Sequence, residues 1–145
     1  MSTGYSGTPL EKKLGIKEGF SIKLINEPVY YWTLFDTIPV NITNRSKSSK
    51  DLDFIHIFSS KKADLPGLKS FRKQIKPNGI IWVSWPKKNS GISSEINEDS
   101  IRQMALSVGL VDVKVCAIDD VWSGLKLVIP VTLRKKLSTP PISYN

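Results

Sequence analysis

The chain has 145 residues, of which 40% are hydrophobic and 23% charged, and this predicts one globular domain over residues 1–133. No apolar run approaches the roughly 20 residues of a membrane-spanning helix, and the N-terminus lacks a secretory core, so we expect a cytoplasmic protein without a membrane partner. The net charge of +8 rests on 17 lysines and only four scattered arginines, so nucleic acid is an alternative partner that we do not favour.

The first predicted elements are a short helix and a strand. Thr8-Pro9-Leu10-Glu11 has the pattern of a capping box, so a helix is expected over about residues 9–14, with Gly15 ending it. The apolar stretch 20–25 is typical of a strand. Residues 1–7 are rich in Gly, Ser and Thr, and we expect them to be flexible.

A second helix is predicted after the sequence Asn26-Glu27-Pro28, which breaks the first strand. Apolar residues recur at helical spacing over residues 29–38, and Pro39 should end the helix. Residues 40–43 are a short strand candidate, and the polar residues 44–50 form a loop.

Two buried strands occupy the middle of the chain. Residues 53–58 (DFIHIF) and 79–85 (GIIWVSW) are nearly continuously apolar, which indicates strands covered on both faces, as in a parallel sheet. A helix is expected between them from about Leu65 to Ile75, followed by a turn at residues 76–79 (KPNG). Residues 87–95 are expected to form a loop.

The last elements are a helix and two strands. Asn97 should cap the helix and Gly109 should end it. Residues 111–118 alternate, with their valines facing one way, which predicts a half-exposed edge strand, whereas residues 125–131 are more continuously apolar and should lie inside. The short link 119–124 implies a hairpin and therefore an antiparallel pair.

The order of elements predicts an α/β protein with a mainly parallel sheet and helices on both faces. The charged, Pro-rich residues 134–145 are expected to form a flexible tail.

The closing pattern of strand, helix, turn, strand, glycine-ended helix and hairpin resembles the second half of class I S-adenosylmethionine-dependent methyltransferases. The whole chain is also similar to a family of small bacterial proteins of unknown function, through GYSGTPL at 4–10, WVSWPKK at 82–88 and VDVKVCAIDDVWSGLK at 111–126. The resemblance implies a Rossmann-like, methyltransferase-like sheet of about six strands with a C-terminal antiparallel hairpin. It carries no activity over.

The chain departs from the methyltransferase pattern where that class holds its cofactor. A glycine-rich loop follows the first strand there, but Asn26-Glu27-Pro28 has no glycine, and its proline removes a backbone donor. An acidic residue ends the second strand in that class, but Thr43-Asn44-Arg45 has none. The link to the strand at 53–58 is also too short for the usual helix–strand–helix. We therefore expect no cofactor held in the usual manner.

Ligands of open α/β sheets bind outside the carboxyl ends of the strands. Trp85 and Trp122 follow two such ends and could wall one pocket, with lysines beside them for a flat or anionic ligand. The alternative is that the tryptophans cover the sheet end and the lysines are solvated. The predicted ligand-binding residues are Asn26, Ser59, Ser60, Lys61, Trp85, Lys87, Lys88, Trp122, Ser123 and Lys126.

No residue is predicted to be catalytic. His56 lies within an apolar strand and is interpreted as a satisfied core histidine, and one histidine with the single cysteine does not predict a metal site. No motif gives Cys116 a base. Asp119 and Asp120 could form an acid–base pair, although acidic residues are common in hairpin turns.

The sequence thus favours a non-catalytic or degenerate methyltransferase-like domain that binds a small anionic or nucleotide-like ligand, or a protein partner, at the strand ends. The first alternative is a divergent methyltransferase or another transferase, which rests on the fold alone. The second alternative is a nucleic-acid-binding protein.

Overall fold

The computed structural model describes residues 7–45, 47 and 50–138. The predicted flexible segments at the two ends of the chain lie outside the described residues, apart from Gly7 and residues 134–138. Residues 134–138 belong to a helix, α4 (Val131–Ser138), so the start of the predicted tail is helical. Within the described ranges, no helix is both long enough and apolar enough to cross a membrane.

Six strands form one sheet in the order β2-β1-β3-β4-β6-β5. Strands β2, β1, β3 and β4 run parallel to one another, and β6 runs antiparallel to both β4 and β5. This confirms the predicted mainly parallel sheet with a C-terminal hairpin. The predicted edge and inner positions of the last two strands are also confirmed. The strands are β1 Ser21–Ile25, β2 Thr43–Asn44, β3 Leu52–Phe58, β4 Ile75–Pro86, β5 Val111–Ala117 and β6 Trp122–Val128.

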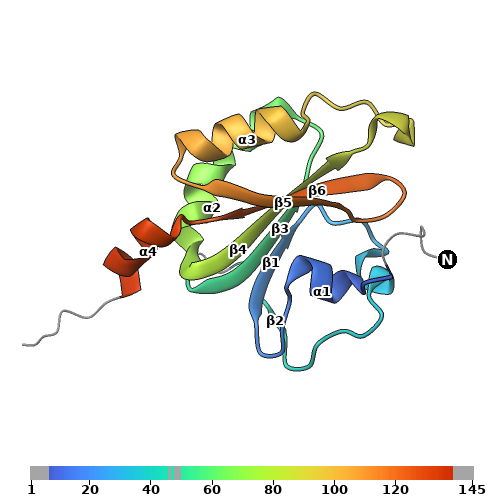
Figure 1. Cartoon of the computed structure of the whole chain (residues 1–145). Coiled ribbons are helices and arrows are strands. Elements are labelled where there is room, and N and C mark those ends of the chain that lie inside the picture. The colour runs from blue at the N-terminus through green and yellow to red at the C-terminus, as the bar shows by residue number, and fades with distance from the viewer. Residues whose placement is uncertain (1–6, 46, 48–49, 139–145) are drawn as a thin grey trace, which may run out of the picture.

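Helices cover both faces of this sheet, with α2 and α3 on one side and α1 on the other (Figure 1). The α-helices besides α4 are α1 Leu10–Leu14, α2 Leu68–Gln74 and α3 Glu98–Ser107, and the 3-10 helices are η1 Tyr31–Leu34, η2 Lys62–Gly67 and η3 Lys88–Ser90.

Each face of the sheet has its own core. Ile55, Val83 and Leu125 lie in the cluster beneath α2 and α3. Phe54 and Trp82 lie in the cluster beneath α1 and η1. The indole N–H of Trp82 donates to the carbonyl oxygen of Leu14 at 2.9 Å, so this fully buried tryptophan is a core residue, as the sequence predicted.

The predicted helix over residues 29–38 is wrong, because only the four residues of η1 are helical. The carboxylate of Glu11 accepts the backbone N–H groups of Asp36 and Thr37, at 3.1 and 2.9 Å. These two amides would otherwise donate to the preceding helical turn. α1 begins after Pro9, so its N-cap lies one residue later than the predicted N-cap Thr8.

The predicted turn at residues 76–79 lies inside β4 as an irregularity. Leu52 pairs with Ile75, whereas Phe54 pairs with Ile80, so β4 carries extra residues there. A Cβ on Gly79 would lie 2.7 Å from the Cβ of Ile75, so the close approach requires glycine.

The regular alternation predicted for the edge strand is interrupted by a register shift between Asp112 and Lys114. Asp112 and Val115 stand opposite Leu127 and Leu125, two residues of the same core cluster, so they share the α3 face. The register shift places the carboxylate of Asp112 on the α3 face. There it accepts a hydrogen bond from the guanidinium of Arg102 on α3, at 3.1 Å.

A buried hydrogen-bonded chain connects η1 to the middle of the sheet. The hydroxyl of Tyr31 lies 2.9 Å from Nδ1 of His56, and Nε2 of His56 lies 2.8 Å from the hydroxyl of Ser84. All three side chains are at most 1% exposed. Burial lowers the pKa of His56 to about 3 and raises that of Tyr31, so both side chains are neutral at pH 7. His56 is thus a satisfied core histidine, as the sequence indicated.

Because His56 is the only histidine, its protonation can be followed without assignment ambiguity. We expect its imidazole proton signals in NMR spectra to show no titration between pH 8 and 5. The folded pKa lies below the unfolded value of 6.5, so the stabilisation is complete above pH 6.5. As the pH falls from 6.5 toward 3, the free energy of unfolding decreases by up to about 1.4 kcal/mol per pH unit, because the unfolded state binds a proton that the buried imidazole does not. A titration midpoint near 6.5 in the folded protein would contradict the buried neutral imidazole.

Candidate functional site

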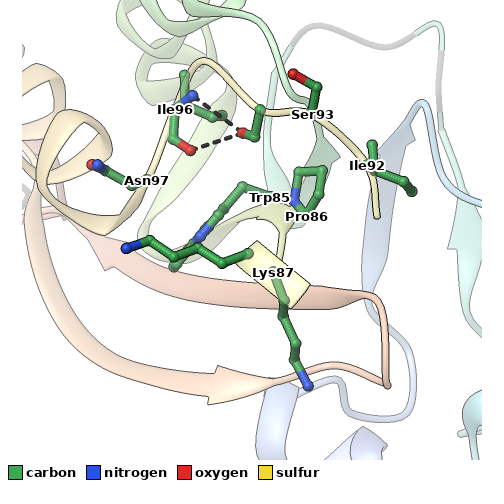
Figure 2. A pocket seen from close by; sticks show the side chains of 9 residues that line it. Trp85, Pro86, Lys87, Ile92, Ser93, Ile96 and Asn97 are labelled. Carbon is green, nitrogen blue, oxygen red and sulfur yellow. Dashed lines mark hydrogen bonds between the residues drawn. The ribbon is translucent and has the colours of Figure 1, made fainter. Parts of the chain in front are cut away.

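A pocket of about 280 Å³ opens at the carboxyl end of β4. Figure 2 shows Trp85 and Pro86 at its centre, with the segment that carries Ile92, Ser93 and Ile96 passing along one side and Lys87 on the other. Its lining combines apolar surface with positive charge and neutral polar groups. The residues are Trp85, Pro86, Lys87, Lys88, Ile92, Ser93, Ser94, Ile96 and Asn97.

The segment 92–97 is held in place by its own turn and by the segment that follows β3. The hydroxyl of Ser94 donates to the carbonyl of Ile96 and accepts the N–H of the same residue, at 2.8 and 3.2 Å. The N–H of Glu95 donates to the carbonyl of Ser60 at 2.8 Å, and the carboxylate of Glu95 accepts the N–H of Lys62 at 2.9 Å. The pocket wall is therefore anchored at several points.

Charge around the pocket is positive on the β4 side and balanced on the α3 side. Lys87 and Lys88 supply two cations. Glu98 and Asp99, in the first turn of α3, both form ion pairs with Arg102. Asn97 begins the helix with a reciprocal capping box, in which its side-chain oxygen accepts the N–H of Ser100 at 2.9 Å. The remaining field in the pocket comes mainly from the lysines and favours an anion.

Three of the ten sequence-predicted site residues line this pocket, namely Trp85, Lys87 and Lys88. The segment after β3 lies nearby but forms a turn of its own. The Ser59 hydroxyl donates to the carboxylate of Asp64 at 2.6 Å and accepts the N–H of Lys61 at 3.0 Å. Ser60 contributes its carbonyl to the anchoring of Glu95.

The expectation that Trp85 and Trp122 wall one pocket is wrong, because the two side chains lie on opposite faces of the sheet. Trp85 belongs to the core beneath α2 and α3 and is 9% exposed. Trp122 pairs with Pro86, one residue further along β4, and packs on the other face against Phe58, with ring centroids 5.1 Å apart. Successive side chains of a strand alternate between faces, which separates the two tryptophans.

The remaining predicted residues are also outside the pocket. Ser123 is the partner of Trp85 in the β4–β6 ladder and does not line the cavity. Lys126 pairs with Trp82 and Lys114, and burial together with the charges of Lys114 and Lys17 lowers its pKa. Asn26 follows the last residue of β1, adopts the left-handed region with φ 58°, and is exposed.

Sequence reasoning missed most of one wall of the pocket. The sequence predicts the segment 92–97 only as a loop and a helix cap, and nothing in its composition distinguishes a pocket wall from a solvated connection. One usable signal was the pair Ile92 and Ile96, two apolar residues in an otherwise polar loop beside a tryptophan.

Aromatic side chains occupy the region after β1. The hydroxyl of Tyr30 hydrogen-bonds the carboxylate of Asp119 and accepts the indole N–H of Trp122. Burial and the bond to Asp119 raise the pKa of Tyr30 to about 12. Tyr31 packs edge-on against Phe58 with ring centroids 5.7 Å apart. This segment therefore connects the end of β1 with the hairpin, across the end of β3.

The other candidates have structural roles. Asp119 accepts the N–H groups of Val121 and Trp122, both at 2.8 Å, and so fixes the hairpin turn rather than pairing with Asp120 as an acid and base. Burial raises the pKa of the Cys116 thiol, which disfavours the reactive thiolate. In the part of the chain that the structure describes, no three His, Cys, Asp or Glu side chains gather as metal ligands.

Two adjacent tyrosines allow a matched test of these hydrogen bonds. Tyr31→Phe leaves buried Nδ1 of His56 without its partner, so we expect a loss of about 1–3 kcal/mol in the free energy of unfolding. Tyr30→Phe removes bonds at a half-buried site, and we expect a loss of about 0.5–1.5 kcal/mol. Urea denaturation at pH 7 measures both variants, and equal or reversed losses would contradict the assigned burial of the two hydroxyls.

The comparisons with known proteins identify a fold and no family. Neither the scan against protein-family models nor the search of curated proteins gives a match. Among solved structures, a SAM-dependent methyltransferase from Aquifex aeolicus is 13% identical, with a TM-score of 0.59, over 83% of this chain and 88% of that one. A putative methyltransferase from Thermoplasma acidophilum is 8% identical, with a TM-score of 0.53, over 80% of this chain and 70% of that one.

Magnesium protoporphyrin IX methyltransferase from Synechocystis PCC 6803, a structure with bound SAM, is 7% identical, with a TM-score of 0.53, over 83% of this chain and 74% of that one. At such low identities the similarity shows the fold alone. The chain therefore has the Rossmann-like fold of class I methyltransferases, as the sequence predicted.

Proposed function

We propose that this chain is a non-catalytic, methyltransferase-like binding domain that takes a small anionic ligand with an apolar body at the carboxyl end of β4. The observation that carries the proposal is the pocket of about 280 Å³, in which Trp85 and two isoleucines lie beside Lys87 and Lys88. Ligand pockets are typically lined by apolar and aromatic side chains, with a few polar groups that fix orientation.

The chemistry of the lining selects the ligand class. Pro86, Ile92 and Ile96 favour a ring or a short aliphatic body, and the two ammonium groups favour a carboxylate or a phosphate. The volume is near the lower end of the range for small-molecule sites, about 300–1,000 Å³, so the pocket suits a nucleotide-sized ligand or part of one. An acidic side chain of a protein partner next to an apolar one would use the same groups.

The region after β1 supports a binding role over methyl transfer in the usual manner. Asn26-Glu27-Pro28 offers no glycine at which a backbone could approach a cofactor closely, and Pro28 has no N–H to donate. The aromatic contacts of Tyr30 and Tyr31 occupy the ends of the neighbouring strands. Arg45, rather than a carboxylate, follows β2.

One observation favours a second candidate, a divergent methyltransferase. β1 and β2 keep the parallel pairing that places their carboxyl ends side by side. The methyltransferases of similar fold include one determined with bound SAM. Under this alternative the same sheet edge would hold the cofactor through contacts that differ from the usual loop.

A lysine exchange inside the pocket, with a matched exchange outside it, tests the first candidate. We expect calorimetry against a panel of nucleotides, small carboxylates and S-adenosylmethionine to find a ligand that Lys88→Gln weakens at least fivefold. Lys61→Gln makes the same change in charge at an exposed site that does not line the pocket, and it should change the affinity less than twofold. Equal losses in the two variants would indicate a general electrostatic effect and contradict the assigned pocket. Binding of S-adenosylmethionine unaffected by Lys88→Gln would favour the second candidate.

A further inference from the structure

A second cavity lies at the amino ends of the strands, at the opposite end of the sheet from the pocket described above. It has a volume of about 350 Å³. Three segments meet there: the residues before β3, the end of α2 and the irregular start of β4. The lining residues are Lys50, Asp51, Arg72, Lys73, Ile75, Lys76 and Pro77.

The lining of this cavity is strongly basic. Four of its seven residues are cationic, and Asp51 is the only acidic one. Lys76 forms an ion pair with Asp53 at 3.0 Å, and Asp53 also accepts the N–H of Ser21 at 2.8 Å. Among the lining residues the four cations thus outnumber the single carboxylate. The carboxyl end of α2 adds a partial negative charge, which Lys73 in its last turn offsets.

The guanidinium of Arg72 is fixed by a glycine turn. Its Nε donates to the carbonyl of Gly109 at 3.0 Å. The contact requires glycine at position 109 for two reasons. Gly109 has φ 85°, a conformation that side chains disfavour, and a Cβ at this position would lie only 3.0 Å from Nε of Arg72. A guanidinium anchored through Nε holds its two terminal amino groups in a fixed orientation. Such a planar fork matches two oxygens of a phosphate group.

We propose that this cavity binds a phosphate group, with Arg72 as the anchored bidentate donor and Lys50, Lys73 and Lys76 as the surrounding cations. Phosphate is favoured over a carboxylate because the cations converge from three chain segments, and a tetrahedral anion with several oxygens can contact them together. The phosphate can belong to a small phosphorylated molecule or to a nucleic-acid backbone. The site shares no residue with the pocket at the carboxyl end of β4, so the two proposals stand independently.

Inorganic pyrophosphate is the probe for this site. With the full chain at low ionic strength, we expect calorimetry to show that Arg72→Gln weakens pyrophosphate binding at least tenfold and Lys73→Gln at least threefold. Lys69→Gln is the matched control, because Lys69 is an exposed residue one turn earlier on α2 and does not line the cavity; its effect should be below twofold. The absence of binding by the unmodified protein at millimolar pyrophosphate would overturn the proposal. Equal effects of Lys69→Gln and Lys73→Gln would also overturn it.

Two further variants keep the result specific. Arg72→Lys retains the charge and loses the anchored fork, so we expect it to weaken binding nearly as much as Arg72→Gln. Lys73→Gln alters an exposed side chain and carries the test if Arg72→Gln fails to fold. Loss of binding in Lys88→Gln but not in Arg72→Gln would overturn this site and support the carboxyl-end pocket instead.

Competition distinguishes the two sources of phosphate. A single-stranded oligothymidylate that displaces pyrophosphate, with affinity lowered by Arg72→Gln and falling steeply with salt, indicates a nucleic-acid backbone as the ligand. Pyrophosphate binding that the oligonucleotide does not displace indicates a small phosphorylated molecule. Either outcome places the phosphate group in the cavity.

Discussion

The hydrogen-bonded chain from Tyr31 through His56 to Ser84 is the constraint that fixes the segment after β1 across the carboxyl end of this sheet. A histidine in the middle of a covered strand must have both ring nitrogens satisfied, because an unpaired buried polar group costs about 1–3 kcal/mol. One of its two partners comes from the segment after β1. That segment must therefore lie across the sheet, where its aromatic rings pack against Phe58.

This placement has a consequence for function. In class I methyltransferases the region after the first strand holds the cofactor, whereas here it contributes Tyr30 and Tyr31 to an aromatic cluster that extends to Trp122. A pocket at this end of the sheet lies on the other face, beside Trp85. The chain thus has a methyltransferase-like fold, and the pocket that we propose for ligand binding lies away from the position of the usual cofactor.

Much of the fold could be predicted because its signals are local. The uninterrupted apolar runs identified β3 and the main part of β4, and the short link before β6 identified the antiparallel hairpin. The helix expected over residues 29–38 failed because a distant carboxylate, that of Glu11, accepts two amides that the helix would have used. Such a long-range contact leaves no trace in the local pattern.

The site was predicted only in part for a similar reason. The sequence points to the carboxyl end of β4, and Trp85, Lys87 and Lys88 line a pocket there. The side of the sheet on which Trp122 lies depends on the register of β6 against β4, which a sequence alone does not fix. The anchored position of Arg72 was beyond sequence reasoning as well, since it depends on a carbonyl 37 residues away.

The most direct test of this account is to map backbone amide chemical shifts during titrations with S-adenosylmethionine and with the nucleotide or carboxylate that binds best. The account predicts that the bound ligand perturbs the amides of Lys87, Lys88 and Asn97 and leaves those of Asn26 to Tyr31 unchanged. Perturbations by S-adenosylmethionine centred on Asn26, Glu27 and Asn44 would contradict it, because they would show that the end of β1 still holds the cofactor.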